Sequence, residues 1–280
     1  MHYFMATMSG RMHSRSQERI LLLYLAMVLE ETPFSWDGWR KHWPKKGYVV
    51  LATNHPGTTS RDSLPERTVM IWERAKDLTE ILNWAENPRI EGLSLDTANI
   101  SVAGFSLGGH SALAISGLQV SKVKFIEYCD RNADIWDCGW LSRGGVDFTE
   151  INADLYDARY PDNRVGATIA IDPALAPVAI IESAARISHP VIVINFKPHE
   201  GVPEALDAAR ITEVMPNARY KVIPQSWHFS FLPECSLLGK IVIGLGGEEN
   251  ICSDWKLRDR SDVHQALINQ IVPFLDESLK

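Results

Sequence analysis

The residues best suited to carry out chemistry lie in the segment GFSLGG, residues 104–109. A β-rich run at residues 98–103 precedes this segment, and a helix-like run at residues 110–118 follows it. A strand, a tight turn and a helix around G-x-S-x-G form a nucleophile elbow, which exposes the serine hydroxyl at the strand tip. Flanking glycines permit the sharp turn, and the helix N-terminus favours developing negative charge. The pattern predicts Ser106 as a nucleophile and the backbone N–H of Leu107 as an oxyanion donor.

The serine motif by itself does not establish this chemistry. A bare G-x-S-x-G is expected by chance in roughly one chain in ten of this length. A glycine-rich connection between a strand and a helix, without any chemistry, is the alternative. A serine hydroxyl is a poor nucleophile until a base takes its proton. The interpretation therefore depends on a histidine and an acid in suitable places.

His228 is the candidate base. It lies in the sequence WHFSF, residues 227–231, directly after the last expected strand at residues 219–224. Where an elbow serine is used, the chain order of the three groups is nucleophile, acid and histidine. A lone histidine is more often structural, but its position and order favour a catalytic role for His228.

Two carboxylates compete for the role of the acid. Asp172 follows the apolar run at residues 165–171, and Glu200 lies in the loop after the next apolar run, residues 190–195. A charged residue at the C-terminal tip of a strand sits at the functional edge of a parallel sheet. We therefore favour Asp172 over Glu200 for orienting His228. The alternative role for Asp172 is that of a turn residue before a proline.

Two further residues are candidates to line a substrate pocket. His55 follows the apolar run at residues 47–53, and Trp227 directly precedes His228. Tryptophans are more often simply part of a core, so an aromatic pocket wall is the bolder interpretation. The sequence does not indicate which acyl or alcohol group such a pocket would accept.

Composition places the chain among ordinary globular proteins. Of its 280 residues 45% are hydrophobic and 22% are charged, with a net charge of -7 and no basic stripe. This balance argues against a nucleic-acid partner. The partner that we expect is a small-molecule ester substrate. No apolar run approaches the roughly 20 residues of a membrane span. We expect a single domain over residues 1–280, of unknown oligomeric state.

Apolar runs that suit buried strands alternate with helix-like runs along the chain. The alternation predicts an α/β fold with a mostly parallel central sheet flanked by helices. Residues 127–164 break this pattern and carry nine acidic and four basic residues. They are expected to form a cap-like insertion over the active site or, equally, a solvated surface excursion. The expected strands are 47–53, 98–103, 165–171, 190–195 and 219–224, and the expected helices are 64–87, 110–118, 203–214 and 261–279.

Four cysteines form two pairs that are close in sequence: Cys129 with Cys138, and Cys235 with Cys252. Short separations suit disulfides that close small loops, and four free thiols in a cytoplasmic protein are the alternative. Disulfides would indicate an oxidising compartment, periplasmic or secreted, although no clear signal peptide is evident. No C-x-x-C occurs and no histidine lies near these cysteines at a metal-ligand spacing, so we expect neither a metal nor another cofactor.

Several segments together resemble the predicted dienelactone hydrolase group related to platelet-activating-factor acetylhydrolases, which have the α/β-hydrolase fold. The resemblance runs from about Pro33 to the C-terminus. In the acetylhydrolases the acid follows the earlier strand, as Asp172 does here, and such proteins are often exported. Dienelactone hydrolases use a cysteine nucleophile, so Ser106 implies a general carboxylester hydrolase. The segments are GYVVLATNHPGTTSRD at 47–62, GFSLGGH at 104–110, AIDPALAP at 170–177, HFSFLPEC at 228–235 and RDRSDVHQALINQIVPFL at 258–275, preceded by Cys252.

The chain departs from that group in one important place. The group carries a His-Gly-x-Gly-Gly loop after an early strand, which supplies the second oxyanion donor. This chain has AMVLEET at residues 26–32 instead. Removing one oxyanion donor typically lowers turnover by about a hundred- to a thousandfold.

A shift of reading frame is our hypothesis for this departure. Suitable codons for residues 25–32, read in another frame, encode Ser-His-Gly-Ala-Gly-Gly-Asn. Residues 1–32 are therefore atypical and, in this hypothesis, out of frame through a lesion or a sequencing slip. The coding DNA tests the hypothesis, because its alternative frame must encode the glycine loop.

Two functions remain open from the sequence. The first is a serine carboxylester hydrolase that uses Ser106, Asp172 and His228 as a triad and forms an acyl-enzyme on a small or medium ester. The second is a catalytically impaired hydrolase-fold protein, or a binding module, that lacks the glycine oxyanion loop.

Overall fold

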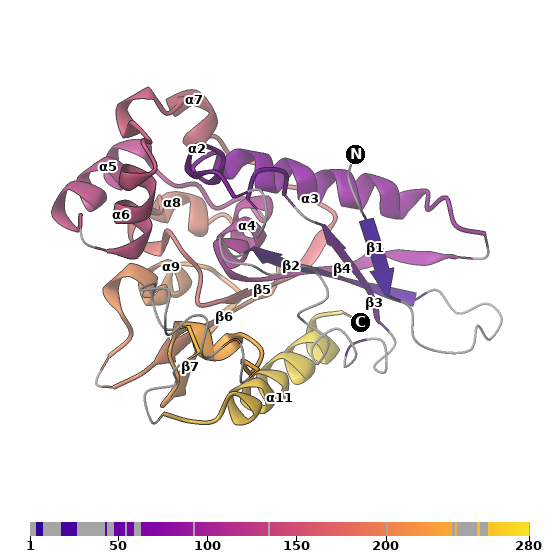
Figure 1. The fold of residues 1–280 in the computed structure, drawn as a ribbon. Helices are drawn as coiled ribbons and strands as arrows, with labels where there is room; N and C mark the ends of the chain where they lie inside the picture. The colour runs from indigo at the N-terminus through magenta and orange to yellow at the C-terminus, as the bar shows by residue number, and fades with distance from the viewer. Residues whose placement is uncertain are drawn as a thin grey trace.

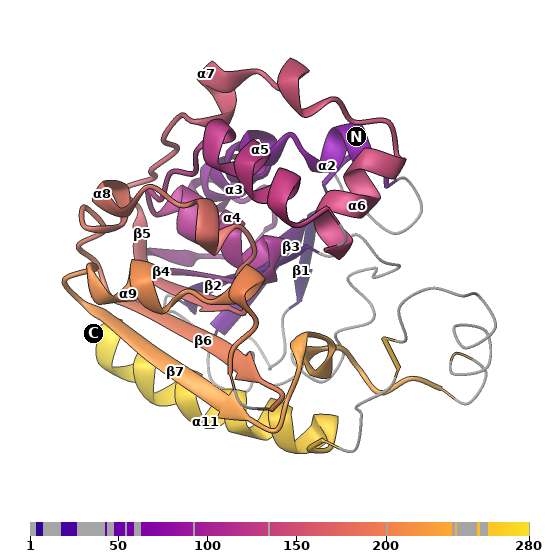
Figure 2. The same ribbon diagram turned by 90° about the vertical axis from the view of Figure 1, so that its left-hand side faces the viewer.

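The computed structural model describes most of the chain beyond residue 62 and shorter parts before it. Its core is a mostly parallel seven-stranded sheet with the order β1-β3-β2-β4-β5-β6-β7, drawn in Figures 1 and 2. Within it only β1 runs antiparallel to its neighbour. The described residues are 4–7, 18–26, 43, 48–53, 55–58, 63–91, 93–133, 135–199, 201–236, 239, 251–252 and 257–279.

The strands confirm the expected alternation and extend it toward the N-terminus. The sheet contains a strand within residues 1–32, β2, which lies between β3 and β4. This strand is absent from the expected strands, although its sequence ERILLLYLA contains a continuous apolar run. The bounds are β1 Phe4–Thr7, β2 Glu18–Ala26, β3 Tyr48–Thr53, β4 Leu95–Ser106, β5 Val165–Ile171, β6 Val191–Lys197 and β7 Ala218–Pro224.

Helices cover both faces of the sheet. Figure 1 shows α11 along one face, with α3 and α4 on the opposite face. The expected helix at 203–214 is instead the 3-10 turn η4 and the short helix α9. The bounds are α2 Pro65–Thr68, α3 Ile71–Glu86, α4 Leu107–Ile115, α5 Lys122–Arg131, α6 Trp136–Arg143, α7 Ala153–Tyr156, α8 Ile181–Ala184, α9 Ala209–Glu213 and α11 Arg260–Ser278, with 3-10 turns η2 Phe148–Glu150, η3 Ala176–Val178, η4 Glu204–Leu206 and η5 His228–Phe231.

The expected helix at 64–87 is two helices, α2 and α3, because the backbone leaves the helical conformation at Met70 (φ -79°, ψ 59°). Val69 and Trp72 pack against the α5–α7 region, whereas Leu78 and the residues after it pack on the sheet. The break lets this segment serve two different hydrophobic clusters.

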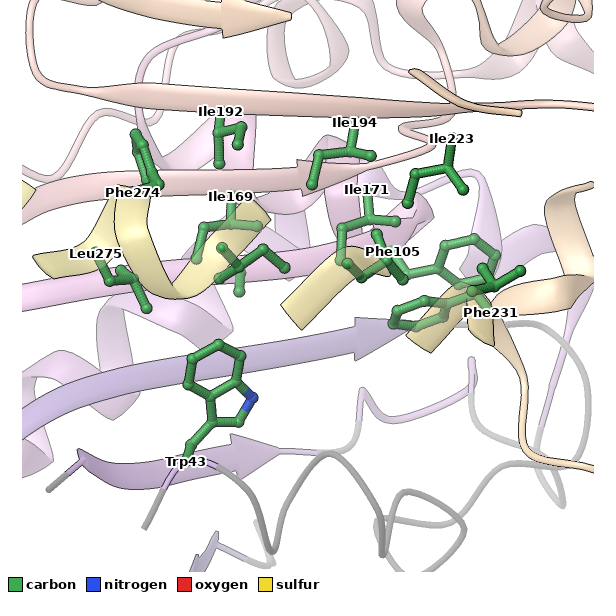
Figure 3. Packing of buried hydrophobic residues seen from close by; sticks show 14 of the residues in the cluster. Trp43, Phe105, Ile169, Ile171, Ile192, Ile194, Ile223, Phe231, Phe274 and Leu275 are labelled. Atoms are coloured by element: carbon green, nitrogen blue, oxygen red, sulfur yellow. The ribbon is translucent and has the colours of Figure 1, made fainter. Parts of the chain in front are cut away.

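Successive residues of a strand point to opposite faces, so a central strand such as β5 contributes to two layers of the core. Ile169 and Ile171 of β5 face α11, whereas Ala170 packs beneath α8 and α9. Figure 3 shows the layer under α11, where aliphatic and aromatic side chains interlock. Its members include Trp43, Phe105, Ile192, Ile194, Ile223, Phe231, Phe274 and Leu275.

The irregular region between α4 and β5 forms a small helical layer of its own. Helices α5, α6 and α7 lie together near α2 in Figure 2. They pack on α2 and on the start of α3 through a cluster that also contacts Leu107, the residue after the candidate nucleophile. The expected cap-like role of residues 127–164 stays a prediction.

Both expected cysteine pairs are disulfides. Cys129 in α5 is bonded to Cys138 in α6, with 5.3 Å between their Cα atoms. Cys235 is bonded to Cys252, with 5.7 Å between their Cα atoms. Across the described ranges, none of the helices has the length and apolar character needed to cross a membrane.

Candidate active site

Ser106 stands at the predicted turn between a strand and a helix. It is the last residue of β4, and α4 begins at Leu107. Its φ of 55° and ψ of -124° lie outside the ordinary strand and helix regions, and its carbonyl accepts a hydrogen bond of 3.0 Å from the N–H of Ala174. The turn aims the serine side chain away from the end of the strand, as a nucleophile elbow requires.

A close backbone approach holds the elbow against the end of β5. A Cβ atom on Gly109 would lie 3.1 Å from the carbonyl oxygen of Ile171 and 3.1 Å from the Cα of Pro173. Only glycine leaves room for α4 to pack this closely. The contact places the helix that starts after Ser106 beside the segment that carries Asp172.

The imidazole of His228 connects the serine to an aspartate. Its Nε2 lies 2.9 Å from Ser106 Oγ, and its Nδ1 lies 2.7 Å from Asp172 Oδ2. The ring packs against Phe105, with centroids 4.5 Å apart, and edge-on against Phe229 at 5.2 Å. The side chain is 17% exposed, so one part of the imidazole reaches solvent.

Asp172 directly follows β5 and is fully buried, with its side chain 1% exposed. Its Oδ1 accepts hydrogen bonds from the N–H of Phe196 at 3.0 Å and from Asn195 Nδ2 at 2.8 Å. A buried carboxylate is costly unless donors surround it. These two donors and His228 supply the partners that the Asp172 carboxylate needs.

The structure therefore brings Ser106, His228 and Asp172 together, in the order that sequence analysis favoured. Glu200, the alternative acid, lies outside the described residues, so its role stays a prediction. Asn195 was missed by sequence analysis. The signal that could have identified it is its polar side chain at the end of the otherwise apolar run PVIVIN, residues 190–195.

Leu107 begins α4, and the first N–H groups of a helix have no acceptor within that helix. On the neighbouring strand, Ala26 ends β2 and is paired with Ser106. Residues 27–42 follow and lie outside the described residues. The oxyanion role of Leu107 and the frame hypothesis for residues 1–32 therefore stay predictions.

A second histidine–aspartate pair lies at the start of α3. His55 is only 4% exposed, and its Nδ1 is hydrogen-bonded to Asp77 Oδ2. Burial, together with the nearby charge of Arg74, holds the pKa of His55 well below its ordinary value. Its place in a substrate pocket stays a prediction.

Arg74 sits at the centre of this buried polar group. It is 1% exposed, and burial lowers its pKa to about 9, against the opposing effect of the Asp77 carboxylate. Burial, and then the Arg74 charge, lower the pKa of His110 in α4 to about 3. Sequence analysis missed Arg74 and Asp77, although Arg74 falls on the apolar stripe of α3.

Trp227, the other candidate pocket residue, is half-buried beside the core under α11. Its ring meets Phe229 edge-on, with centroids 4.8 Å apart. Its place in a pocket also stays a prediction. Among the residues that the structure describes, no group of three or more His, Cys, Asp or Glu side chains could hold a metal ion.

Unusual backbone conformations are concentrated around this site. In the described part of the chain, four non-glycine residues have positive φ, and all follow or end strands β4, β5 or β7 at the carboxyl edge of the sheet. Such conformations cost about 1–3 kcal/mol each and cluster at functional sites. The four residues are Ser106, Asp172, Leu175 and Gln225.

Solved structures share this architecture. A ferulic acid esterase from Streptomyces cinnamoneus aligns with a TM-score of 0.59 at 17% identity, over 95% of this chain and 68% of that one. Esterase 2 from Thermogutta terrifontis, phosphoramylated by tabun, aligns with a TM-score of 0.54 at 11% identity, over 97% of this chain and 90% of that one. The chain has the α/β-hydrolase fold.

The same fold occurs within larger proteins. A candidate dipeptidyl aminopeptidase IV from Bacteroides ovatus aligns with a TM-score of 0.58 at 12% identity over 99% of this chain. The chain spans about a third of that protein, 34% of its length. No family profile and no curated protein sequence matches the chain. At these identities the likeness establishes the α/β-hydrolase fold and leaves the activity to be argued from the site.

Proposed function

We propose that the protein is a serine carboxylester hydrolase that acts on small or medium esters through an acyl-enzyme. One observation carries the proposal: a single imidazole lies 2.9 Å from the elbow hydroxyl and 2.7 Å from a buried carboxylate. The hydroxyl, base and acid stand in the relation that nucleophilic acyl transfer requires.

In the proposed reaction, Ser106 Oγ attacks the ester carbonyl while His228 Nε2 takes its proton. Asp172 holds the imidazole in the required tautomer and stabilises the imidazolium. The tetrahedral intermediate collapses as His228 returns the proton to the leaving alcohol. Water then attacks the acyl-enzyme with His228 again acting as the base, which releases the carboxylic acid and restores Ser106.

The negative oxygen of the tetrahedral intermediate needs hydrogen-bond donors. The backbone N–H of Leu107 is the proposed first donor, because it opens α4, whose positive dipole end points at the same place. This reaction requires no metal and no organic cofactor. His55 and Trp227 remain the proposed pocket residues, and Glu200 remains the alternative acid.

The narrower assignment is also a proposal. The motifs around Ser106, Asp172 and His228 support a relation to the dienelactone hydrolase and platelet-activating-factor acetylhydrolase-like group. Serine in place of cysteine favours ordinary esters over dienelactones. The aligned structures fit this chemistry: one is a ferulic acid esterase, and another is an esterase with butyrate bound.

Export from the cytoplasm is proposed on the basis of the disulfides. Two of them join four cysteines, and none of these cysteines is free. Disulfides persist in oxidising compartments such as the periplasm or the extracellular space. We also propose that the chain is a single domain in which residues 127–164 form a cap-like insertion.

A fluorophosphonate probe and short p-nitrophenyl esters test the proposed function. We expect the wild type to hydrolyse p-nitrophenyl acetate and butyrate and to be labelled by the probe, and Ser106→Ala to abolish both. Ser116→Ala is a matched control, because it removes another hydroxyl of the same helix region, bonded to Ala112 and Thr168. Folded wild type that shows neither labelling nor hydrolysis would favour the impaired hydrolase or binding module.

A further inference from the structure

Asn195 is a buried amide whose entire hydrogen-bonding capacity is used. Its Nδ2 donates to Asp172 Oδ1 at 2.8 Å and to the carbonyl oxygen of Leu206 at 2.7 Å. Its Oδ1 accepts from the N–H of Ala208 at 3.1 Å and from the hydroxyl of Tyr220 at 3.0 Å. An amide has two donor hydrogens and two acceptor lone pairs, so no capacity is left over.

These partners also fix which way the amide points. The backbone N–H of Ala208 can only donate, and the carbonyl of Leu206 can only accept. If the amide of Asn195 were rotated by half a turn, its Oδ1 would face the carbonyl of Leu206 and its Nδ2 would face the N–H of Ala208, so neither hydrogen bond could form. The side chain therefore has a single orientation, in which Nδ2 is directed at Asp172.

The phenol of Tyr220 contributes to this orientation. Burial, followed by the nearby carboxylate of Asp207, raises the pKa of Tyr220. The hydroxyl therefore keeps its proton throughout the working pH range. Its single hydrogen has two acceptors within reach, and Asn195 Oδ1 at 3.0 Å is nearer than Asp207 Oδ1 at 3.4 Å.

The consequence for Asp172 is a fixed carboxylate plane. Asn195 and the N–H of Phe196 both bind Oδ1, which leaves Oδ2 to face His228 Nδ1. Rotation of the carboxyl group would break both bonds to Oδ1. Two groups of β6, the Asn195 amide and the Phe196 N–H, thus fix the Asp172 carboxylate, and this carboxylate in turn fixes the orientation of the His228 imidazole.

We propose that Asn195 is a positioning residue for the reaction, which acts through Asp172 to hold His228 in line with Ser106. The inference rests on the proposed function for its kinetic consequence. Its structural part, that the buried Asn195 amide fixes the orientation of the Asp172 carboxylate, can be measured without reference to any enzymatic activity.

Asn195→Leu tests the proposal, with Thr168→Val as the matched control. Thr168 is buried on the same strand that leads to Asp172, and its hydroxyl lies 2.6 Å from Ser116 Oγ and 2.8 Å from His189 Nε2. Both variants lose buried hydrogen bonds and should lower Tm by several degrees. Only Asn195→Leu is expected to reduce kcat, by about 10- to 100-fold, because a misplaced supporting group typically costs this much.

Two further readouts separate positioning from mere stability. The KM for p-nitrophenyl butyrate should stay within about twofold of the wild type, since Asn195 does not contact the ester. The low-field proton resonance of the hydrogen bond between His228 Nδ1 and Asp172 should be lost or displaced in Asn195→Leu and retained in Thr168→Val.

Tyr220→Phe should reduce kcat by a smaller factor, about two- to fivefold, because it removes only one of the four bonds of the amide.

The outcomes distinguish this inference from the proposed function. An Asn195→Leu variant with unchanged kcat and an unchanged low-field resonance would overturn the positioning role while leaving the esterase proposal intact. If the wild type has no Ser106-dependent hydrolysis, the esterase proposal fails, and the low-field resonance alone decides whether Asn195 orients the pair.

Discussion

His228 and His55 each present Nδ1 to an aspartate Oδ2, yet the surroundings of the two imidazoles differ. His228 is 17% exposed, packs against Phe105, and directs Nε2 at a serine hydroxyl. His55 is 4% exposed, and its own burial, followed by the charge of the buried Arg74 guanidinium, lowers its pKa and so disfavours a positive charge there.

The difference shows that a histidine–aspartate pair is not by itself a catalytic device. A general base must accept a proton during the reaction and hold it as imidazolium. Asp172, with its donors, is arranged to stabilise that cation at His228. Arg74 is placed to oppose it at His55. We therefore propose that the pair at Ser106 carries the chemistry and that the pair on α3 does not act as a base, while His55 stays a proposed pocket residue.

Truncation of each histidine to alanine is the strongest test of the difference between the two pairs. We expect His228→Ala to reduce kcat by about four to six orders of magnitude, since loss of the base from a triad removes its cooperative action. His55→Ala should keep kcat within about tenfold while it lowers the free energy of unfolding by about 1–3 kcal/mol, because Asp77 loses a buried partner. Ester hydrolysis and urea unfolding measure the two effects. Equal losses of kcat in two folded variants would remove the distinction.

Amide substitution of the two aspartates gives a somewhat smaller effect. Asp172→Asn should lower kcat by about 10⁴-fold, because the neutral amide favours the wrong tautomer of His228. Asp77→Asn should leave kcat nearly unchanged. The rates are read with p-nitrophenyl butyrate, and Glu200→Gln serves as a third arm. A large loss in Glu200→Gln alone would transfer the role of the acid to Glu200.

The pair on α3 should reveal itself through the pH dependence of stability. In the unfolded chain a histidine gains a proton as the pH falls through about 6.5. The folded protein resists this, since the pKa of His55 is lowered and that of His110 is about 3. The unfolded state thus binds more protons between these values, and stability falls with falling pH. For His110 the loss at pH 4.5 relative to neutral pH should be about 2–3 kcal/mol, and His55 adds to it in the same direction.

Urea unfolding at pH 7 and pH 4.5 measures this loss. His110→Asn removes one of the four described histidines whose pKa is lowered in the folded protein, the others being His55, His189 and His264. The difference in the free energy of unfolding between pH 7 and pH 4.5 should therefore shrink by the contribution of His110. A variant with the same pH dependence as the wild type would show that His110 is not the group responsible.

The smallest expected effect concerns the aromatic support of His228. Phe105 lies 4.5 Å from the imidazole and 4.2 Å from Phe231, measured between ring centroids. Phe105→Leu should lower stability by about 1–2 kcal/mol and kcat by severalfold, since aromatic pairs contribute about 0.5–1.5 kcal/mol beyond their buried area. The pH dependence of stability should not change. A change in that dependence would mean that the two histidine pairs are coupled.

Much of this fold could be predicted from local patterns. Residues 165–171 were expected as a strand and form β5 with the same bounds, because a short continuous apolar run rich in β-branched residues before Asp-Pro favours a buried strand. The helix expected at residues 261–279 is likewise confirmed as α11. The strand β2 was not predicted, because it leads into the atypical segment AMVLEET at residues 26–32 and lies within the region for which a shifted reading frame is our hypothesis.

The candidate site could be predicted in part for a similar reason. Ser106, Asp172 and His228 each follow a recognisable strand, so the parallel sheet brings them to one edge. The interaction partners of Asn195 and Arg74 could not be assigned from the sequence. The groups that surround a buried polar side chain come largely from segments that are distant in the chain. Asp172 and Asn195 are 23 positions apart in the chain, and no local pattern links them.

The positive φ angles of Ser106 and Asp172 have a consequence for selection. Glycine would relieve the backbone at both places and would remove the hydroxyl and the carboxylate at the same time. At Asp172 the buried donors of Asn195 and Phe196 would then lose their acceptor, so stability itself retains the carboxylate. At Ser106 thermal endurance alone would favour glycine, and under the proposed function the serine is the kind of mark that selection for turnover leaves against selection for durability.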